Sequence, residues 1–522
     1  MNLLAQTTST TTTTGVTFPT LVLTAMVWSA VVFALVALFM PNQTQDQLRR
    51  IKSLGSTGAG AALFFAIWAV ETQAAAALLP AGTAPGVPGI PGGDLKEQHG
   101  WLTSFPITST YHLDADGLAL AVILMVSVVF FCVSLAAWHN QRHVKLLTVC
   151  LLTLETASLG VLASYDWVLF LLFWTLAIAP VYVLVRAFGH GNKSRAATRY
   201  AATSLVSAGL LLLAAVLIAF QGGSHTFDMG TRPVNLPGDG QTVAFWLVTA
   251  ASLLAMGVVP LHGALLDLEE EGSGLLSAIF AAVLPSLGAY TLIHVAVGFF
   301  PTTSGSYSLF FAALAVVTVV WAGLAALRTD DLRRLIGYAG TVLMGLVLLG
   351  VAGHTTIAIT GVMYLLLARG LVVAVLMLLA SLIQEKTRRL RISQLGGLAW
   401  QAPFLSTFWL VATLAAAGVP LLAGFAGDFF IFTGSFPAHR WATTVVLAGT
   451  VLASGVLVWT AQRVFLGASR DSFARVRDLG PLELTYLGVL AALIVLIGLV
   501  PGHFGVLFQN GASYILFPGT SG

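Results

Sequence analysis

Long apolar runs separated by short polar segments recur along the whole chain. Each run can cross the hydrocarbon core of a bilayer as a helix, which takes about 20 residues. The runs are continuous and do not alternate with period two, so they predict helices and not barrel strands. About fourteen spans are predicted, roughly at 18–40, 56–79, 117–138, 144–163, 167–188, 200–220, 243–262, 275–299, 308–327, 333–352, 357–383, 403–425, 442–465 and 484–505.

Basic residues are confined almost entirely to the segments between these runs. If the amino terminus lies outside, twenty of the 24 Lys and Arg residues fall in inside segments, all except Lys96, Arg232, Arg440 and Arg369. By the positive-inside rule this asymmetry predicts an even number of spans with both termini outside. The membrane expected for such a protein is the bacterial cytoplasmic membrane.

The composition agrees with an all-α polytopic membrane protein. The chain is 57% hydrophobic and 9% charged, with a mean hydropathy of +0.91, far from soluble domains. The net charge of +3 reflects topology and does not point to nucleic acid.

Cys132 and Cys150 both fall in spans, which excludes a disulfide framework. Residues 1–15 lack the basic region of a signal peptide, so the first span is expected to be retained. Residues 81–93 predict an irregular outside loop.

Few ionisable side chains fall inside the spans. Arg369 lies in the middle of the run 357–383, and Glu155 and Asp428 are the other candidates, with Glu71 near a span end. A charge at the centre of a span costs a few kcal/mol by insertion scales, about 3 kcal/mol, unless it is paired. Arg369, Asp428 and Glu155 are therefore candidates for a proton path or a buried ion pair. We expect the Arg369 guanidinium to bond Asp428 first, or Glu155 second.

Two spans contain helix-breaking residues. Pro260 and His262 close the seventh run, and Gly418 and Pro420 interrupt the twelfth, directly before Asp428. Broken spans in corresponding parts of a chain often mark the ion pathway of a transporter. Gly and Pro are also generally commoner in membrane helices. The acid that follows the second break favours the functional interpretation.

Several motifs resemble those of the antiporter-like subunits of respiratory complex I, and their order agrees from about residue 110 to 505. They are Asp116-Gly-Leu118, Phe173-Trp174 with Pro180 and Tyr182, Pro260-Leu-His-Gly263, Asp331 to Tyr338 with Met344-Gly345, Leu395-Gly-Gly-Leu398, and Gly418-Val-Pro420 with Gly424 to Asp428. The chain looks most like the M-type subunit, because the L-type would carry a long carboxy-terminal extension and this sequence stops at Gly522.

The resemblance implies a fold and a setting. It implies two inverted five-helix repeats with broken helices 7 and 12, divided as 1–110, 111–265, 266–425 and 426–522. It also implies a membrane-arm subunit of an NADH/ferredoxin:quinone oxidoreductase, partnered by other membrane-arm subunits, with quinone and NADH bound elsewhere in the complex. We expect no cofactor, metal ion or catalytic residue in this chain. Protons in the family move along a buried row of Lys, His and Glu.

This sequence departs from that row. The positions of the fifth-helix acid, the seventh- and eighth-helix lysines and the tenth-helix histidine are Thr175, Ala255, Ser286 and Leu343. The eleventh-helix histidine position is Arg369, which stays charged and cannot relay a proton. We therefore expect a degenerate or rerouted proton pathway and a structural or coupling role.

Alternatives remain at this stage. A multisubunit cation/proton antiporter or an inorganic-carbon uptake complex could host the same subunit, and an independent solute carrier is a plainer possibility. Glu155 could replace the missing fifth-helix acid or hold Arg369, or it could be a neutral, hydrogen-bonded glutamic acid. The acidic run Glu269 to Glu271 is expected to be a solvated inside loop.

Overall fold

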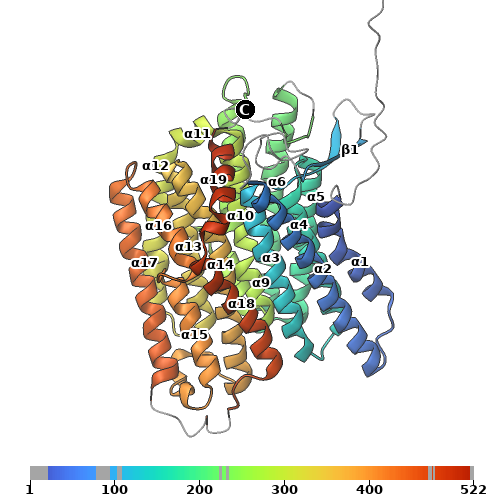
Figure 1. Cartoon of the computed structure of the whole chain (residues 1–522), viewed down its shortest axis with the longest axis vertical. Coiled ribbons are helices and arrows are strands. Elements are labelled where there is room, and N and C mark those ends of the chain that lie inside the picture. The colour runs from blue at the N-terminus through green and yellow to red at the C-terminus, as the bar shows by residue number, and fades with distance from the viewer. Residues whose placement is uncertain are drawn as a thin grey trace, which may run out of the picture.

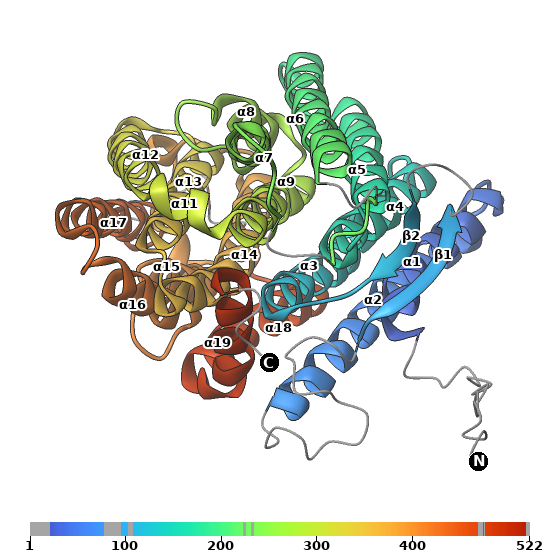
Figure 2. The same ribbon diagram turned by 90° about the horizontal axis from the view of Figure 1, so that it is seen from above.

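The chain folds into one bundle of roughly aligned helices with a β-hairpin at one end (Figures 1 and 2). This structure, a computed structural model, describes residues 21–77, 95–102, 108–222, 226–230, 234–467, 473 and 476–517. The expectations for residues 1–15 and 81–93 lie outside the described residues.

The first six helices follow the predicted spans. They are α1 (Val22–Phe39), α2 (Gln45–Ala77), α3 (Gly117–Ala136), α4 (Val144–Ala163), α5 (Trp167–Phe188) and α6 (Lys193–Gln221), with the 3-10 turn η2 (Ala137–His139) after α3. Asp116 and Asp166 cap α3 and α5, because their carboxylates accept the backbone N–H groups of Ala119 and Val168. Such caps satisfy amide groups that have no partner inside the helix.

The middle of the chain contains the first interrupted span. Helix α7 (Gly240–Met256) ends at Gly257, which has a φ of +64°, and α8 (Gly263–Glu271) begins six residues later. The chain continues through α9 (Gly274–Ala282), α10 (Leu284–Thr291), the π-helix η3 (Leu292–Val297), α11 (Pro301–Ser306) and α12 (Ser308–Arg328). The break therefore falls at Pro260 and His262, as predicted.

The last part holds the second interruption. Its helices are α13 (Leu332–Gly353), α14 (Thr356–Thr387), α15 (Pro403–Ala416), α16 (Ala423–Ser435), α17 (Arg440–Ala461), α18 (Pro481–Leu499) and α19 (Gly502–Leu516), with the short turns η4 (Ile392–Gln394), η5 (Leu398–Trp400) and η6 (Gln462–Leu466). The backbone between α15 and α16 leaves the helix at Gly418, with a φ of +67°, and at Leu421, with a φ of +75°. This break confirms the one predicted at Gly418 and Pro420.

The helices that can cross a membrane agree with most of the predicted spans. Twelve helices of the described residues are long and apolar enough to cross a membrane, and α7 and α15 are shorter apolar helices that end at the two breaks. Counting each broken helix as one span gives the predicted fourteen, but that number and the inverted repeats stay predictions. The predicted span 484–505 is wrong at its end. Helix α18 ends at Leu499, since Pro501 lacks the N–H that would continue it, and α19 follows.

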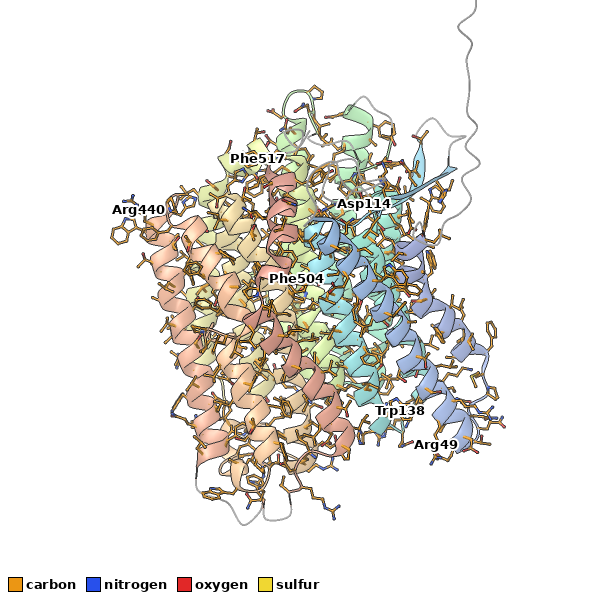
Figure 3. The ribbon with its side chains drawn as sticks, in the orientation of Figure 1. Arg49, Asp114, Trp138, Arg440, Phe504 and Phe517 are labelled. Atoms are coloured by element: carbon orange, nitrogen blue, oxygen red, sulfur yellow. The ribbon has the colours of Figure 1, made fainter. Side chains whose placement is uncertain are left out.

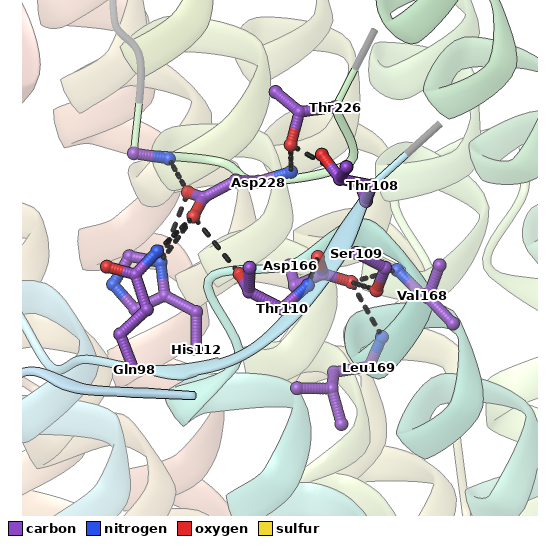
Figure 4. Close-up of polar contacts among 11 residues, drawn as sticks. Gln98, Thr108, Ser109, Thr110, His112, Asp166, Val168, Leu169, Thr226 and Asp228 are labelled. Carbon is purple, nitrogen blue, oxygen red and sulfur yellow. Dashed lines mark hydrogen bonds and ion pairs between the residues drawn. The ribbon is translucent and has the colours of Figure 1, made fainter. Parts of the chain in front are cut away.

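The hairpin was not predicted. Strands β1 (Glu97–Leu102) and β2 (Ser109–Leu113) pair antiparallel. Figure 4 shows how two aspartates bind this hairpin to the helices. Asp166 accepts hydrogen bonds from the Ser109 hydroxyl and the Thr110 N–H, and Asp228 accepts bonds from Gln98, Thr110 and His112. The hairpin is thus tied to the α4–α5 and α6–α7 connections.

The bundle has two distinct ends. Figure 3 places Arg49 and Trp138 at one end and Asp114 and Arg440 at the other. We name the first the basic end and the second, which carries β1 and β2, the hairpin end. Helix α14, which carries Arg369, packs against α3, α9, α13, α15, α16 and α19 between these ends. The most apolar part of α14 is 94% buried. The corresponding parts of α13 and of the segment from α9 to η3 are entirely buried. The core therefore surrounds Arg369.

Candidate functional site

Arg369 lies at the centre of the continuous helix α14 and is 3% exposed. Its Nε donates to the Gly340 carbonyl at 3.4 Å, and its Nη1 lies 3.4 Å from the Ala282 carbonyl and 3.5 Å from Ser286 Oγ. These hydrogen bonds are long, because good N–H···O distances are about 2.9 Å. The guanidinium therefore sits in a polar recess between α9, α10, α13 and α14.

Glu269 of α8 is an acid that lies against the same face of α13 as Arg369. Glu269 is 3% exposed, and its Oε2 has no hydrogen-bond partner among the described residues. The expectation that Glu269 lies in a solvated loop is therefore wrong, because the segment forms the second half of a broken helix that inserts into the core. Its neighbour Glu270 does face solvent, where it pairs with Arg334 at 3.1 Å.

Two glycines of α13 make room for this pair of charges. A Cβ at Gly337 would lie 2.5 Å from Oε2 of Glu269, and one at Gly340 would lie 3.4 Å from Nη2 of Arg369. Residues three apart lie on the same face of a helix. This face of α13 thus accommodates the carboxylate and the guanidinium side by side.

The predicted partners of Arg369 are wrong. Neither Asp428 nor Glu155 forms an ion pair with it, and its hydrogen bonds go to Gly340, Ala282 and Ser286. The reason is the direction of the side chain, which leaves α14 toward α8, α9 and α13. Asp428 and Glu155 lie on other helices, α16 and α4, and their carboxylates face different surroundings.

Asp428 packs against the second helix break. A Cβ at Gly418 would lie 2.5 Å from Oδ2 of Asp428, so the left-handed glycine leaves the space that this carboxylate fills. Asp428 is 8% exposed, and its Oδ1 has no hydrogen-bond partner among the described residues. The acid thus belongs to the interruption itself, as its place after Gly418 and Pro420 suggested.

The first break is closed by aromatic and basic contacts. The ring of His262 lies 4.3 Å from that of Trp321, centroid to centroid. A Cβ at Gly263 would lie 2.7 Å from Nη2 of Arg199, which itself pairs with Asp267 at 2.5 Å. His262 therefore lies at the start of α8, packed against α12.

The four degenerate positions lie in unlike places. Ser286 donates to the Ala282 carbonyl at 2.7 Å and also touches Arg369. Leu343 is buried in the apolar core, and Ala255 lines a cavity of about 40 Å³. Thr175 is exposed on α5 and bonds its own helix at the Leu171 carbonyl. Only Ser286 among them contacts the candidate site.

Sequence reasoning missed one buried pair. His294, in the π-helix η3, lies with its Nδ1 2.9 Å from Oδ2 of Asp116, and both side chains are at most 3% exposed. Tyr290 stacks on the histidine ring at 4.8 Å. A histidine inside the apolar run 275–299 was the available signal. Among the described residues, no group of three His, Cys, Asp or Glu side chains lies together as a metal site would require.

Six of the buried ionisable side chains among the described residues lie in four separate places. They are Arg369 with Glu269, on α14 and α8, His294 with Asp116, on η3 and at the start of α3, Asp428 on α16, and Glu155 on α4. The side chains at Ala255 and Leu343 cannot exchange protons.

Comparison with known proteins gives a consistent result. Residues 164–453 match the family described as NADH:quinone oxidoreductase/Mrp antiporter, TM. NADH-quinone oxidoreductase subunit M of Rickettsia prowazekii is 26% identical over 80% of this chain and 86% of its own length. NAD(P)H-quinone oxidoreductase chain 4 of a Synechococcus species is 30% identical over 76% of this chain and 74% of its own.

Solved structures agree with these relatives. A chain of respiratory complex I from Thermus thermophilus superposes with a TM-score of 0.82 at 25% identity, covering 95% of this chain and 99% of that one. A chain of the Mrp complex from a Dietzia species gives 0.80 at 18% identity over 97% and 98%, which is a likeness of fold. With its interrupted helices and apolar spans, this chain is a multi-pass, antiporter-like membrane protein that belongs to the NADH:quinone oxidoreductase/Mrp antiporter transmembrane family.

Proposed function

We propose that the chain is an M-type, membrane-arm subunit of a complex I-like NADH or ferredoxin:quinone oxidoreductase, with a degenerate proton pathway and a structural or coupling role. Its partners would be other membrane-arm subunits. Quinone and NADH would be bound by other subunits of the complex. We also propose that it lies in a bacterial cytoplasmic membrane, with both termini outside and the basic end facing the cytoplasm.

The observation that carries the proposal is the fixed cation at the centre of the core. Arg369 is 3% exposed, and the buried acid Glu269 lies against the same face of α13. A guanidinium keeps its proton under ordinary conditions, so it can act as an electrostatic barrier but cannot pass a proton onward. A positive charge fixed at this point also repels a second positive charge that moves along the same axis.

The surrounding positions support the same conclusion. The Leu343 side chain has no polar group, and the Ala255 methyl group only lines a cavity. The hydroxyl of Ser286 donates to the Ala282 carbonyl. Thr175 points to the outer face of α5 and α6. A hydroxyl can orient water, but it does not titrate near neutral pH.

The experiment compares assembly with proton pumping. The native complex is isolated through a tag on this chain, and its proton-to-electron ratio is measured in reconstituted vesicles for the wild type and Asp428→Asn. We expect Asp428→Asn to reduce the amount of intact complex while the ratio per complex stays the same. Asp239→Asn, which alters an exposed acid before α7, is the matched control and should change neither.

A well-assembled Asp428→Asn complex with a clearly reduced ratio would overturn the proposal, because it would mean that protons pass through this subunit. The co-purified subunits identify the host: quinone oxidoreductase subunits support the proposal, whereas a cation/proton antiporter or a carbon-uptake assembly would contradict it.

A further inference from the structure

Glu155 is a buried acid that the arrangement around Arg369 does not use. It lies in the middle of α4, it is fully buried, and neither carboxyl oxygen has a hydrogen-bond partner among the described residues. An ionised carboxylate with no partner in an apolar interior costs far more than a neutral one. The side chain must therefore carry a proton, contact water, or do both.

Space for water lies beside this carboxyl group. A cavity of about 20 Å³ between α2, α3 and α4 is lined by Glu155 together with Lys52, Gly55, Ala59, Ser134 and Thr148. About 10–15 Å³ suffices for one water molecule, provided that polar groups are present to bind it. Gly55 and Ala59 leave this room on α2, and the two hydroxyls supply polar partners.

The cavity leads toward the basic end. Among the α2 residues that line the cavity, Lys52 lies closest to the basic end. Its Nζ donates to the Trp138 carbonyl at 2.8 Å. Figure 3 places Trp138 and Arg49 at the basic end of the bundle. Glu155 lies about three helical turns further into the bundle than Val144, where α4 begins. Lys52, on the side of the basic end, and the acid thus line one cavity, whose other lining residues are mostly apolar.

The charges that face Glu155 are few. Helices α1 and α5 both pack on α4. Helix α1 has no ionisable side chain, and Tyr182 and Arg186 of α5 do not line the cavity, to which α2 contributes Lys52. Cys132 is the ionisable residue of α3, and Tyr290 of α10 donates to the Leu162 carbonyl. Lys52 is therefore the cation available to balance the carboxylate.

We propose that Glu155 is a proton-binding site that exchanges its proton with water through this cavity from the basic end only. On release, the carboxyl O–H bond breaks, the proton passes to a cavity water and leaves at the basic end, and Lys52 compensates the carboxylate that remains. This site lies apart from Arg369 and Glu269 and does not depend on the proposed function.

Infrared difference spectroscopy of the full complex in vesicles tests the proposal. The C=O stretching band of a protonated carboxyl shifts when its proton is exchanged for deuterium. We expect one such band to disappear in Glu155→Gln, and its exchange in D₂O to slow about tenfold in Ala59→Leu, which fills the cavity. Ala75→Leu, the same change at an exposed position of α2, should leave the rate unchanged.

Two results would overturn the proposal. If no band depends on Glu155, the carboxyl group carries no proton. If Ala59→Leu and Ala75→Leu exchange at the wild-type rate, water reaches the acid by another route. Because Ala59→Leu can disturb packing, Lys52→Met provides a second variant, in which we expect less deprotonation of Glu155 as the pH at the basic end rises. Unchanged deprotonation in Lys52→Met would exclude the role given to Lys52.

Discussion

Glu269 of α8 and Arg369 of α14 both lie against one face of α13 inside the core, one helical turn apart. Each is 3% exposed, and each occupies space that a glycine of α13 leaves open, at Gly337 and Gly340 respectively. No ion pair within 4 Å joins them among the described residues. They therefore lie near each other in a low-dielectric interior without a direct contact, where an interaction between opposite charges is strong.

Removing one of these charges should cost more than removing both. In Glu269→Gln the arginine stays buried without a counter-charge, and we expect a loss of about 3 kcal/mol of unfolding free energy, the usual scale for such a change. The double variant Glu269→Gln with Arg369→Met should recover about 1–2 kcal/mol of that loss, within the range found for interacting residues. Thermal unfolding of the purified chain measures both.

Glu270 provides the matched control, because it is the next residue and pairs with Arg334 at 3.1 Å on the exposed surface. Glu270→Gln should change stability by less than about 1 kcal/mol. Equal effects of Glu269→Gln and Glu270→Gln would contradict the buried interaction.

The backbone at Gly418 should resist substitution. Gly418→Ala places a Cβ 2.5 Å from Asp428 Oδ2 at a φ of +67°, so we expect a loss of about 1–2 kcal/mol from the left-handed conformation alone. Gly455→Ala in α17 is the control, since nothing lies within 4 Å of a Cβ there, and it should be neutral or stabilising. A Gly418→Ala variant as stable as Gly455→Ala would show that the break adapts.

Much of the fold could be predicted because a bilayer demands long apolar helices. The run 357–383 became α14, and the Pro and Gly residues at 260 and 418 mark breaks where the helices do end. The hairpin could not be predicted, because it is polar and short and is held by Asp166 and Asp228, which lie far from it in the sequence. The boundary at Pro501 was hidden by apolar residues on both sides.

The candidate site was only half predictable, for a physical reason. A cation within a span must find compensation, so the importance of Arg369 followed from its position. Which acid faces it depends on how α8 and α14 are rotated against each other, and that is decided by packing at Gly337 and Gly340. Glu269 lies in an acidic segment that resembles a surface loop until the broken helix inserts it.

The hairpin should loosen as the pH rises. Burial raises the pKa of Asp114 to about 7, although the Ala115 N–H and His112 oppose the shift. The folded state thus prefers the neutral acid, which adds stability at low pH. That contribution declines as the pH rises from about 4, the ordinary value for an aspartate, through the folded value.

Hydrogen exchange of β1 and β2 measures this dependence. Between pH 5 and pH 8, after correction for intrinsic rates, we expect protection of these amides to fall in the wild type. Asp114→Asn, which remains neutral throughout, should keep its protection. An equal decline in both proteins would assign the effect to other groups of the hairpin end.

Restoring charges at two degenerate positions should not restore a pair. Ala255 faces a cavity with Tyr200 and Ser204, whereas Thr175 faces a shallow outer groove with Leu205 and Gly209. Neighbouring residues of α6, Ser204 and Leu205, thus line different spaces. Ala255→Lys would bury an ammonium group beside hydroxyls alone, at a cost of about 3 kcal/mol on the scale of insertion at a helix centre.

Adding Thr175→Glu to Ala255→Lys should leave this loss unrelieved, because the new carboxylate would point into the outer groove and not toward residue 255. Thermal unfolding of the two single variants and the double variant gives the coupling, which we expect to be below about 0.5 kcal/mol, the value for independent sites. A coupling of about 2 kcal/mol or more would mean that the two positions still meet. In that case the central pathway would be repairable by two substitutions, and its degeneracy would reside in side chains alone and not in the packing of α5 and α6.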